Sequence, residues 1–86
     1  KNGRRRASGG ISKLRKYRFA REHIYIARLK NGFSQHKLAK LIGVTEVTIS
    51  RWENGSRVPN ASYLANLASV LGVDINYFYV RENIYE

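Results

Sequence analysis

Apolar side chains recur at helical spacing along much of the chain, and the clearest case lies between residues 61 and 71. The positions i, i+3, i+4 and i+7 are taken by Leu64, Leu67, Ala68 and Leu71. That spacing puts all four on one face of an α-helix, so this stretch is predicted to be a helix with one buried side. Asn60 is a suitable N-cap, and Gly72 can take the left-handed conformation that ends a helix.

Four further helices are predicted from the same periodicity and from capping residues. The first is expected to follow Ser12 as its N-cap and to end at Asn31, before Gly32. The others are expected over residues 35–42, 46–54 and 75–79, with Ser34, Thr45 and Asp74 as their N-caps. No strand is expected, because the alternating stretches 24–26 and 77–79 are short and flanked by caps. These elements divide the chain into an arm (1–11), a domain (12–79) and a tail (80–86).

The helices over 35–42 and 46–54 are spaced like a helix-turn-helix. A small residue in the first helix, Ala39, allows close crossing, Gly43 supplies a positive φ in the turn, and Ile49 fills the crossing. At 100° per residue, Ile49 and Trp52 form a buried edge of the second helix. The opposite arc is predicted to be exposed, and it carries Glu46, Val47, Ser50 and Arg51.

From about Ile24 to Phe78 the chain resembles the Cro/cI-type (XRE) helix-turn-helix domain of phage repressors and related bacterial regulators. The resemblance rests on Phe33-Ser34-Gln35, Leu38-Ala39, Ile42-Gly43-Val44-Thr45, Ile49-Ser50-Arg51-Trp52-Glu53-Asn54-Gly55, Pro59, Leu67-Ala68 and Leu71-Gly72-Val73. It implies an all-α fold: a compact five-helix, lambda-repressor-like DNA-binding domain, here with a basic N-terminal arm.

The resemblance also implies residue roles. Base edges in the major groove would be read by Glu46, Val47, Ser50 and Arg51. The DNA backbone would be contacted by Gln35, Thr45, Thr48, Lys37, Lys40 and Arg57, and Gln35 would also brace the second helix. The scaffold would comprise a buried ion pair between Arg28 and Glu53 together with Ala39, Gly43, Ile49 and Trp52. Arg51 can donate two bonds to guanine, Glu46 can accept from cytosine N4, and Val47 can contact a thymine methyl.

The positions of Glu46 and Val47 often carry glutamine in relatives, so a base preference cannot be transferred from them. Glu46 is unfavourable near phosphates unless it meets a cytosine or bonds Arg51.

The net charge of +10 is concentrated at one end, since residues 1–21 hold nine Lys or Arg and no acid. This asymmetry favours a polyanionic partner, nucleic acid before anionic lipid, over a tail that only aids solubility. The arm residues expected to follow phosphates or a minor groove are Arg4, Arg5, Arg6, Lys13, Arg15 and Lys16. Because the chain opens on Lys1 and has no methionine, we expect a processed chain or a piece of a longer protein, with residues 1–10 either native or a cloning remnant.

Several functional classes are not expected. The chain has no cysteine, and His23 and His36 have no partners at metal-ligand spacing, so no metal or other cofactor is expected. No recognisable catalytic pair of carboxylates or activated serine is present, so an enzyme is not expected. No apolar run approaches the roughly 20 residues of a membrane span, and no small-molecule ligand is evident.

The sequence therefore predicts a cytoplasmic, bacterial or phage-encoded regulator, a repressor, that binds an inverted repeat in double-stranded DNA as a homodimer. The C-terminal end of the chain is rich in apolar side chains, and some of them are expected to pack across the partner: Tyr77, Phe78, Tyr79, Ile84 and Tyr85. Alternatively, this end leads to a further domain. Two alternatives stay open. One is an antitoxin-like protein-interaction module that also autoregulates its operon, and the other is a structured-RNA binder that uses the arm alone.

Overall fold

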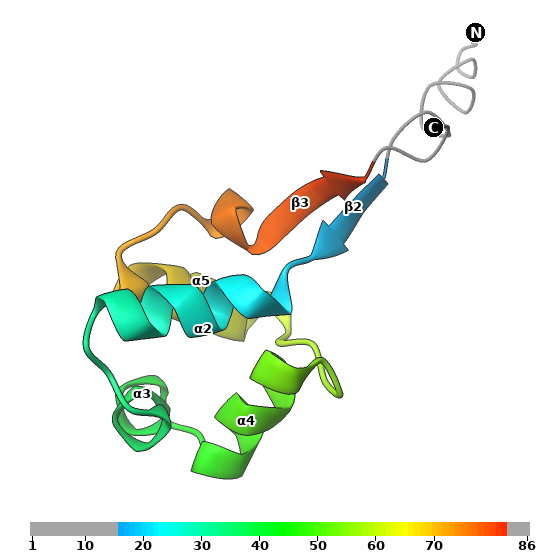
Figure 1. Ribbon diagram of the computed structural model, residues 1–86. Coiled ribbons are helices and arrows are strands. Elements are labelled where there is room, and N and C mark those ends of the chain that lie inside the picture. Colours follow the sequence, from blue (N-terminus) through cyan, green and yellow to red (C-terminus); the bar gives the residue numbers. More distant parts are fainter. Residues whose placement is uncertain (1–15, 83–86) are drawn as a thin grey trace, which may run out of the picture.

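The structure is a computed structural model that describes residues 16–82 (Figure 1). Four helices and a short 3-10 helix form the body, and two strands form a ribbon that projects from it. The predicted arm contacts Arg4, Arg5, Arg6, Lys13 and Arg15 lie outside the described residues, as do Ile84 and Tyr85. The elements, in order, are β2 (Lys16–Phe19), α2 (Arg21–Lys30), α3 (Gln35–Ile42), α4 (Glu46–Asn54), α5 (Ala61–Leu71), η1 (Ile75–Phe78) and β3 (Tyr79–Glu82).

The three middle helices begin and end where their capping residues predict. The Ser34 hydroxyl accepts from the Lys37 N–H at 2.9 Å at the start of α3. The Thr45 hydroxyl accepts from the Thr48 N–H at 3.2 Å at the start of α4, and Asn60 performs the same role for α5. Such side chains satisfy N–H groups that have no partner inside the helix, which fixes its first residue.

The predicted first helix is wrong over residues 16–20. Residues 16–19 form strand β2, and the helix begins only at Arg21. The turning point is Ala20, which is fully buried and donates its N–H to the Phe78 carbonyl at 2.7 Å. That contact comes from the far end of the chain, so no local pattern could reveal it.

The ribbon also corrects the expectation that the chain has no strands. β2 pairs antiparallel with β3, with Lys16 opposite Glu82 and Phe19 opposite Tyr79. The first tail residues thus form a strand, and the packing of the tail across a partner stays a prediction. The predicted helix over 75–79 is a 3-10 turn that stops at Phe78, because Tyr79 already belongs to the strand. The architecture is therefore four helices plus a two-stranded ribbon, not five helices.

An exposed ion pair joins the ribbon to the body. Arg18 on β2 donates to the Glu22 carboxylate in the first turn of α2 at 2.9 Å. This hydrogen bond, with a smaller contribution from the backbone N–H of Glu22 itself, lowers the pKa of Glu22 from its ordinary 4.5 to about 2. The carboxylate therefore stays charged, and the pair persists, well into the acid range.

The core lies between the four helices and η1. Its fully buried side chains come from each of these elements: Ile24 from α2, Leu38 from α3, Ile49 from α4, Leu67 from α5 and Phe78 from η1. Large aliphatic side chains at such positions each contribute roughly 1.5–3 kcal/mol by leaving water. The core thus holds α3 and α4 at a fixed angle, with the outer face of α4 left free (Figure 1).

Candidate nucleic-acid interface

The turn between α3 and α4 has the geometry that the spacing predicts. Gly43 takes a left-handed conformation with φ +86°, and its N–H donates to the Ala39 carbonyl at 2.8 Å. Ala39 and Ile49 are buried at the crossing, and Trp52 is also in the core. These four residues occupy the scaffold positions assigned to them, and together they set the angle at which α4 leaves the turn.

Three of the four predicted base-reading side chains are exposed. Glu46, Val47 and Arg51 all lie on the outer surface of α4, whereas Ser50 is half-buried. Val47 is 56% exposed. The face therefore offers a carboxylate, an apolar group and a guanidinium to any surface that approaches α4.

Of the two partners considered for Glu46, a cytosine and Arg51, the structure shows no bond to Arg51 within residues 16–82. The Glu46 Oε1 instead lies 3.7 Å from Nδ1 of His36, which is on the first turn of α3. Both side chains are exposed, at 71% for His36 and 56% for Glu46. Sequence reasoning placed His36 on an outward face without a role, because nothing local connects residues on two different helices.

The end of α4 is held by a cluster around Glu53. Arg28 donates its Nε to Glu53 Oε2 at 2.6 Å and its Nη2 to Oε1 at 3.1 Å. Gln35 donates its Nε2 to the same Oε1 at 2.9 Å. Gln35, for which a phosphate contact was predicted, is therefore half-buried and braces α4 from the start of α3. Its side-chain oxygen takes no part in this hydrogen bond.

Arg21 is a further support that the sequence did not reveal. Its Nη1 donates to the backbone carbonyl of Glu53 at 3.1 Å, near the C-terminal end of α4. Its side chain also lies against Gly55, where an added Cβ would fall 2.7 Å from the Arg21 Cδ. Gly55 has φ +86°, so the backbone at this helix end favours glycine, and an added Cβ would also oblige the exposed Arg21 side chain to move.

The remaining backbone candidates lie in two places. Lys37 and Lys40 are exposed on α3, and Thr45 and Thr48 stand at the start of α4, with their hydroxyl oxygens 3.0 Å apart. Lys16 is exposed but lies on the ribbon, at the end far from α4 (Figure 1). The structure therefore gathers the α3 and α4 candidates and separates Lys16 from them.

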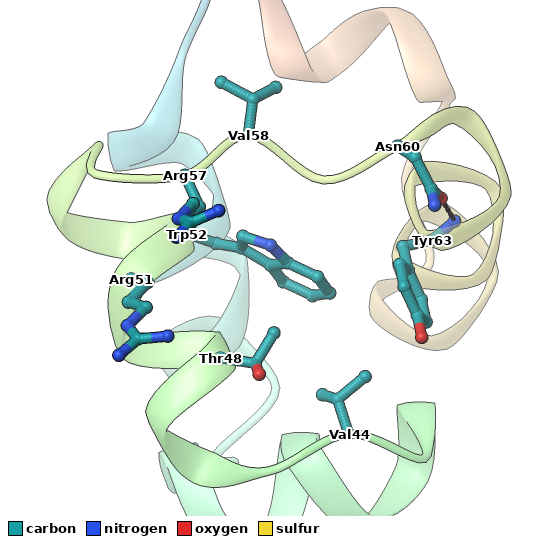
Figure 2. A pocket seen from close by; sticks show the side chains of 8 residues that line it. All are labelled: Val44, Thr48, Arg51, Trp52, Arg57, Val58, Asn60 and Tyr63. Atoms are coloured by element: carbon teal, nitrogen blue, oxygen red, sulfur yellow. Dashed lines mark hydrogen bonds between the residues drawn. The ribbon is translucent and has the colours of Figure 1, made fainter.

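A hollow of about 390 Å³ opens beside α4 (Figure 2). One wall comes from α4 and the following loop, the other from the start of α5, and the rings of Trp52 and Tyr63 are 5.3 Å apart across it. No acid lines the hollow, whereas two arginines do. The lining residues are Val44, Thr48, Arg51, Trp52, Arg57, Val58, Asn60 and Tyr63.

The hollow suits an anion. Arg51 and Arg57 supply positive charge, and Thr48 and Asn60 add polar groups. The Asn60 side-chain oxygen is already used by the Tyr63 N–H at 2.9 Å, so its amide nitrogen is the free donor. Sequence reasoning found Thr48 and Arg57 but not Asn60 or Tyr63, which it assigned only to capping and to helix 61–71.

Other kinds of site find no support in residues 16–82. No group of three or more His, Cys, Asp or Glu side chains in this range could hold a metal ion. Nor does any helix there combine the length and apolar character needed to cross a membrane.

Comparison with known proteins identifies this arrangement. The sequence model of the Helix-turn-helix family matches residues 24–78, the segment that contains both helices, the turn and the Arg28–Glu53 pair. The chain belongs to the helix-turn-helix family. The Cro/cI-type resemblance is thereby confirmed.

Relatives of this helix-turn-helix chain occur in bacteria and plants. An uncharacterized HTH-type transcriptional regulator of Sinorhizobium medicae is 34% identical over 56 residues, and multiprotein-bridging factor 1c of Arabidopsis thaliana is 43% identical over 49 residues. The matches cover 65% and 57% of this chain but only 40% and 33% of those proteins. The chain thus corresponds to less than half of either relative.

Two solved structures share the fold of the helix-turn-helix chain. The P22 c2 repressor, crystallised with a synthetic operator, matches with a TM-score of 0.67 and 33% identity over 71% of this chain and 92% of that chain. HppE, crystallised with its substrate, matches with a TM-score of 0.62 and 29% identity over 70% of this chain but only 34% of that one. The fold therefore occurs both as a DNA-bound repressor domain and as part of a larger, substrate-binding protein.

Proposed function

We propose that this chain is the DNA-binding part of a transcriptional regulator that recognises a specific sequence in double-stranded DNA. The observation that carries the proposal is the exposed face of α4, with Glu46, Val47 and Arg51 held outward on a helix braced at both ends. A helix of this kind fits the major groove, where base pairs are distinguished by their donors, acceptors and methyl groups. The match to an operator-bound repressor supports it.

We propose that the hollow beside α4 binds a phosphate of the DNA backbone. A helix in the major groove brings the adjacent strand against its flanks, and Arg57 and Thr48 line that flank here. Lys37 and Lys40 on α3 would face the other strand. These contacts would position α4 without reading sequence, while Arg51, at the border of both surfaces, is assigned to the bases.

We further propose that the protein acts as a repressor and binds an inverted repeat as a homodimer, in the cytoplasm. Two-fold symmetric binding would place the half-sites about one helical turn apart. Support comes from the P22 c2 repressor, a repressor seen on an operator. No catalytic role is assigned, since HppE shares the fold with this chain over only a third of its own length.

The antitoxin alternative has less support. It predicts that the tail or the first helix, and not Arg51, carries the main affinity for a partner. The regulators and the repressor that resemble this chain favour DNA over a toxin as the partner.

The test is selection of binding sequences from random duplex DNA. The wild type should select one motif, and Arg51→Ala should lose preference at one base pair, by about 1–3 kcal/mol. Arg81→Ala, on the ribbon away from α4, is the matched control and should keep the motif (Figure 1). Failure of the wild type to enrich any motif, or an unchanged motif with Arg51→Ala, would refute direct readout by α4.

A further inference from the structure

His36 and Glu46 are brought together across the turn from the starts of α3 and α4. The His36 Nδ1 and the Glu46 Oε1 are 3.7 Å apart, a distance too long for a hydrogen bond but short for a charge contact. Within residues 16–82, His36 is the only basic side chain with a nitrogen within 4 Å of the Glu46 carboxylate. Both lie on the face assigned above to DNA.

The charges around His36 oppose one another. On its own helix, His36 lies beside Lys37 and near Lys40 and the positive N-terminus of α3. From α4, the Glu46 carboxylate faces it. Whether His36 carries a charge therefore decides whether Glu46 faces the outside paired or alone.

Bound DNA would favour a charged His36 beside Glu46. A lone carboxylate in a groove between phosphates is repelled, whereas an imidazolium beside it cancels its charge and is itself attracted to phosphates. A charged His36 would also hold Oε1 and leave the second oxygen of Glu46 to accept from a base amino group.

We propose that His36 is a further specificity-determining residue, which positions the Glu46 carboxylate and links DNA binding to uptake of a proton. The proposal rests on the proposed function, because it assigns Glu46 to a base. His36 would contact Glu46 rather than the base itself, so its role is that of a positioning residue. Its signature is therefore a pH profile combined with a change in preference at the base pair that Glu46 reads.

The experiment uses the whole chain and the duplex selected by the wild type. The base pair read by Glu46 is identified as the one whose preference changes in Glu46→Gln. Dissociation constants are then measured at pH 6 and pH 8 for the selected duplex and for a duplex changed at that pair. The variants are His36→Gln, Glu46→Gln, the double variant and Lys37→Gln, which removes a neighbouring charge as the matched control.

The wild type should bind about fivefold more tightly at pH 6 than at pH 8, the upper range for an exposed ion pair. His36→Gln should lose this ratio and lose discrimination at the Glu46 base pair, and it should add nothing to Glu46→Gln. Lys37→Gln should weaken binding to both duplexes alike and should still bind more tightly at pH 6 than at pH 8, because His36 is retained.

Two results would overturn the proposal separately. If the wild type selects a motif but His36→Gln keeps both its pH ratio and its discrimination, this inference fails while the proposed function stands. If the wild type selects no motif, the proposed function fails and the inference fails with it.

Discussion

Arg28 and Glu53 form a two-point ion pair between α2 and α4, with nitrogen-to-oxygen distances of 2.6 Å and 3.1 Å. Both side chains are more than nine-tenths buried. Arg28 also donates its Nη1 to the Phe33 carbonyl at 2.9 Å, and Glu53 also accepts from Gln35. Because these bonds occupy both carboxylate oxygens and three guanidinium nitrogens, each charge is compensated, and the pair fixes α4 to the rest of the body.

Removing one member of this pair should destabilise the domain severely. We expect Arg28→Ala to lower the free energy of unfolding by about 3–5 kcal/mol, because Glu53 is left as a buried charge without its main partner. The double variant Arg28→Met/Glu53→Met should be less destabilised than Arg28→Ala, since no unpaired charge remains. Urea unfolding followed by circular dichroism measures both. A double variant less stable than the single one would contradict this explanation.

Gly55 and Gly43 share φ +86° but differ in their surroundings, which gives a matched pair. Gly43→Ala should cost only the strain of a left-handed alanine, about 1–2 kcal/mol. Gly55→Ala should cost more, because its new methyl displaces Arg21 and breaks the bond from Arg21 to Glu53. Thermal unfolding of the two variants compares these costs.

The comparison has an internal control in Arg21→Ala. In that background the additional cost of Gly55→Ala should fall to that of Gly43→Ala, since the side chain that clashed is gone. If the two substitutions lower the stability of the wild type equally, the Arg21 contact does not contribute to stability.

The hollow beside α4 predicts a contact without sequence preference. Arg57→Ala should weaken binding of the selected and of unrelated duplexes by the same factor. It should also reduce the slope of log K against log salt by about 1, as expected for one lost phosphate contact. Tyr63→Phe removes a single hydroxyl from the opposite wall of the hollow. It should change the affinity for DNA but leave the selected motif unchanged. A change of motif in either variant would argue that the hollow meets bases instead of phosphate.

The Arg18–Glu22 pair predicts a stability difference that depends on pH. The pKa of Glu22 is lowered to about 2, so its stabilising contribution is complete above pH 4.5 and is lost as the pH falls towards 2. Glu22→Gln should therefore be slightly less stable than the wild type at pH 7, and this difference should shrink as the pH falls towards 2. Urea unfolding at pH 7 and pH 2.5 tests this, with Arg18→Gln as the partner variant. A deficit that is the same at both pH values would point to a packing effect.

The helix-turn-helix could be predicted from the sequence because its signals are local. Ser34, Gly43, Thr45 and Gly55 each act on residues within four positions, as caps or as left-handed turns. The bounds of α3, α4 and α5 follow from such residues alone. The exposed arc of α4 follows from the helical period, with Ser50 less exposed than that period implies.

The ribbon could not be predicted in this way. Of residues 16–19, Tyr17 fits the helical period and Phe19 does not, so the start of the helix was not fixed by the pattern, and the segment forms a strand where residues 79–82 lie beside it. The contacts of Arg21 with Gly55 and of His36 with Glu46 were missed for the same reason. Each joins two elements whose relative position is set by the core and not by either stretch of sequence.

The pairing of Lys16 with Glu82 has a consequence for how this domain can be connected. The chain enters and leaves the described fold at two neighbouring positions, which lie about 5 Å apart in an antiparallel pair. A domain whose first and last residues are adjacent can be inserted into a surface loop of another protein without distorting either fold. The two strands would then connect the domain to the host protein, with α4 carried at the opposite end (Figure 1).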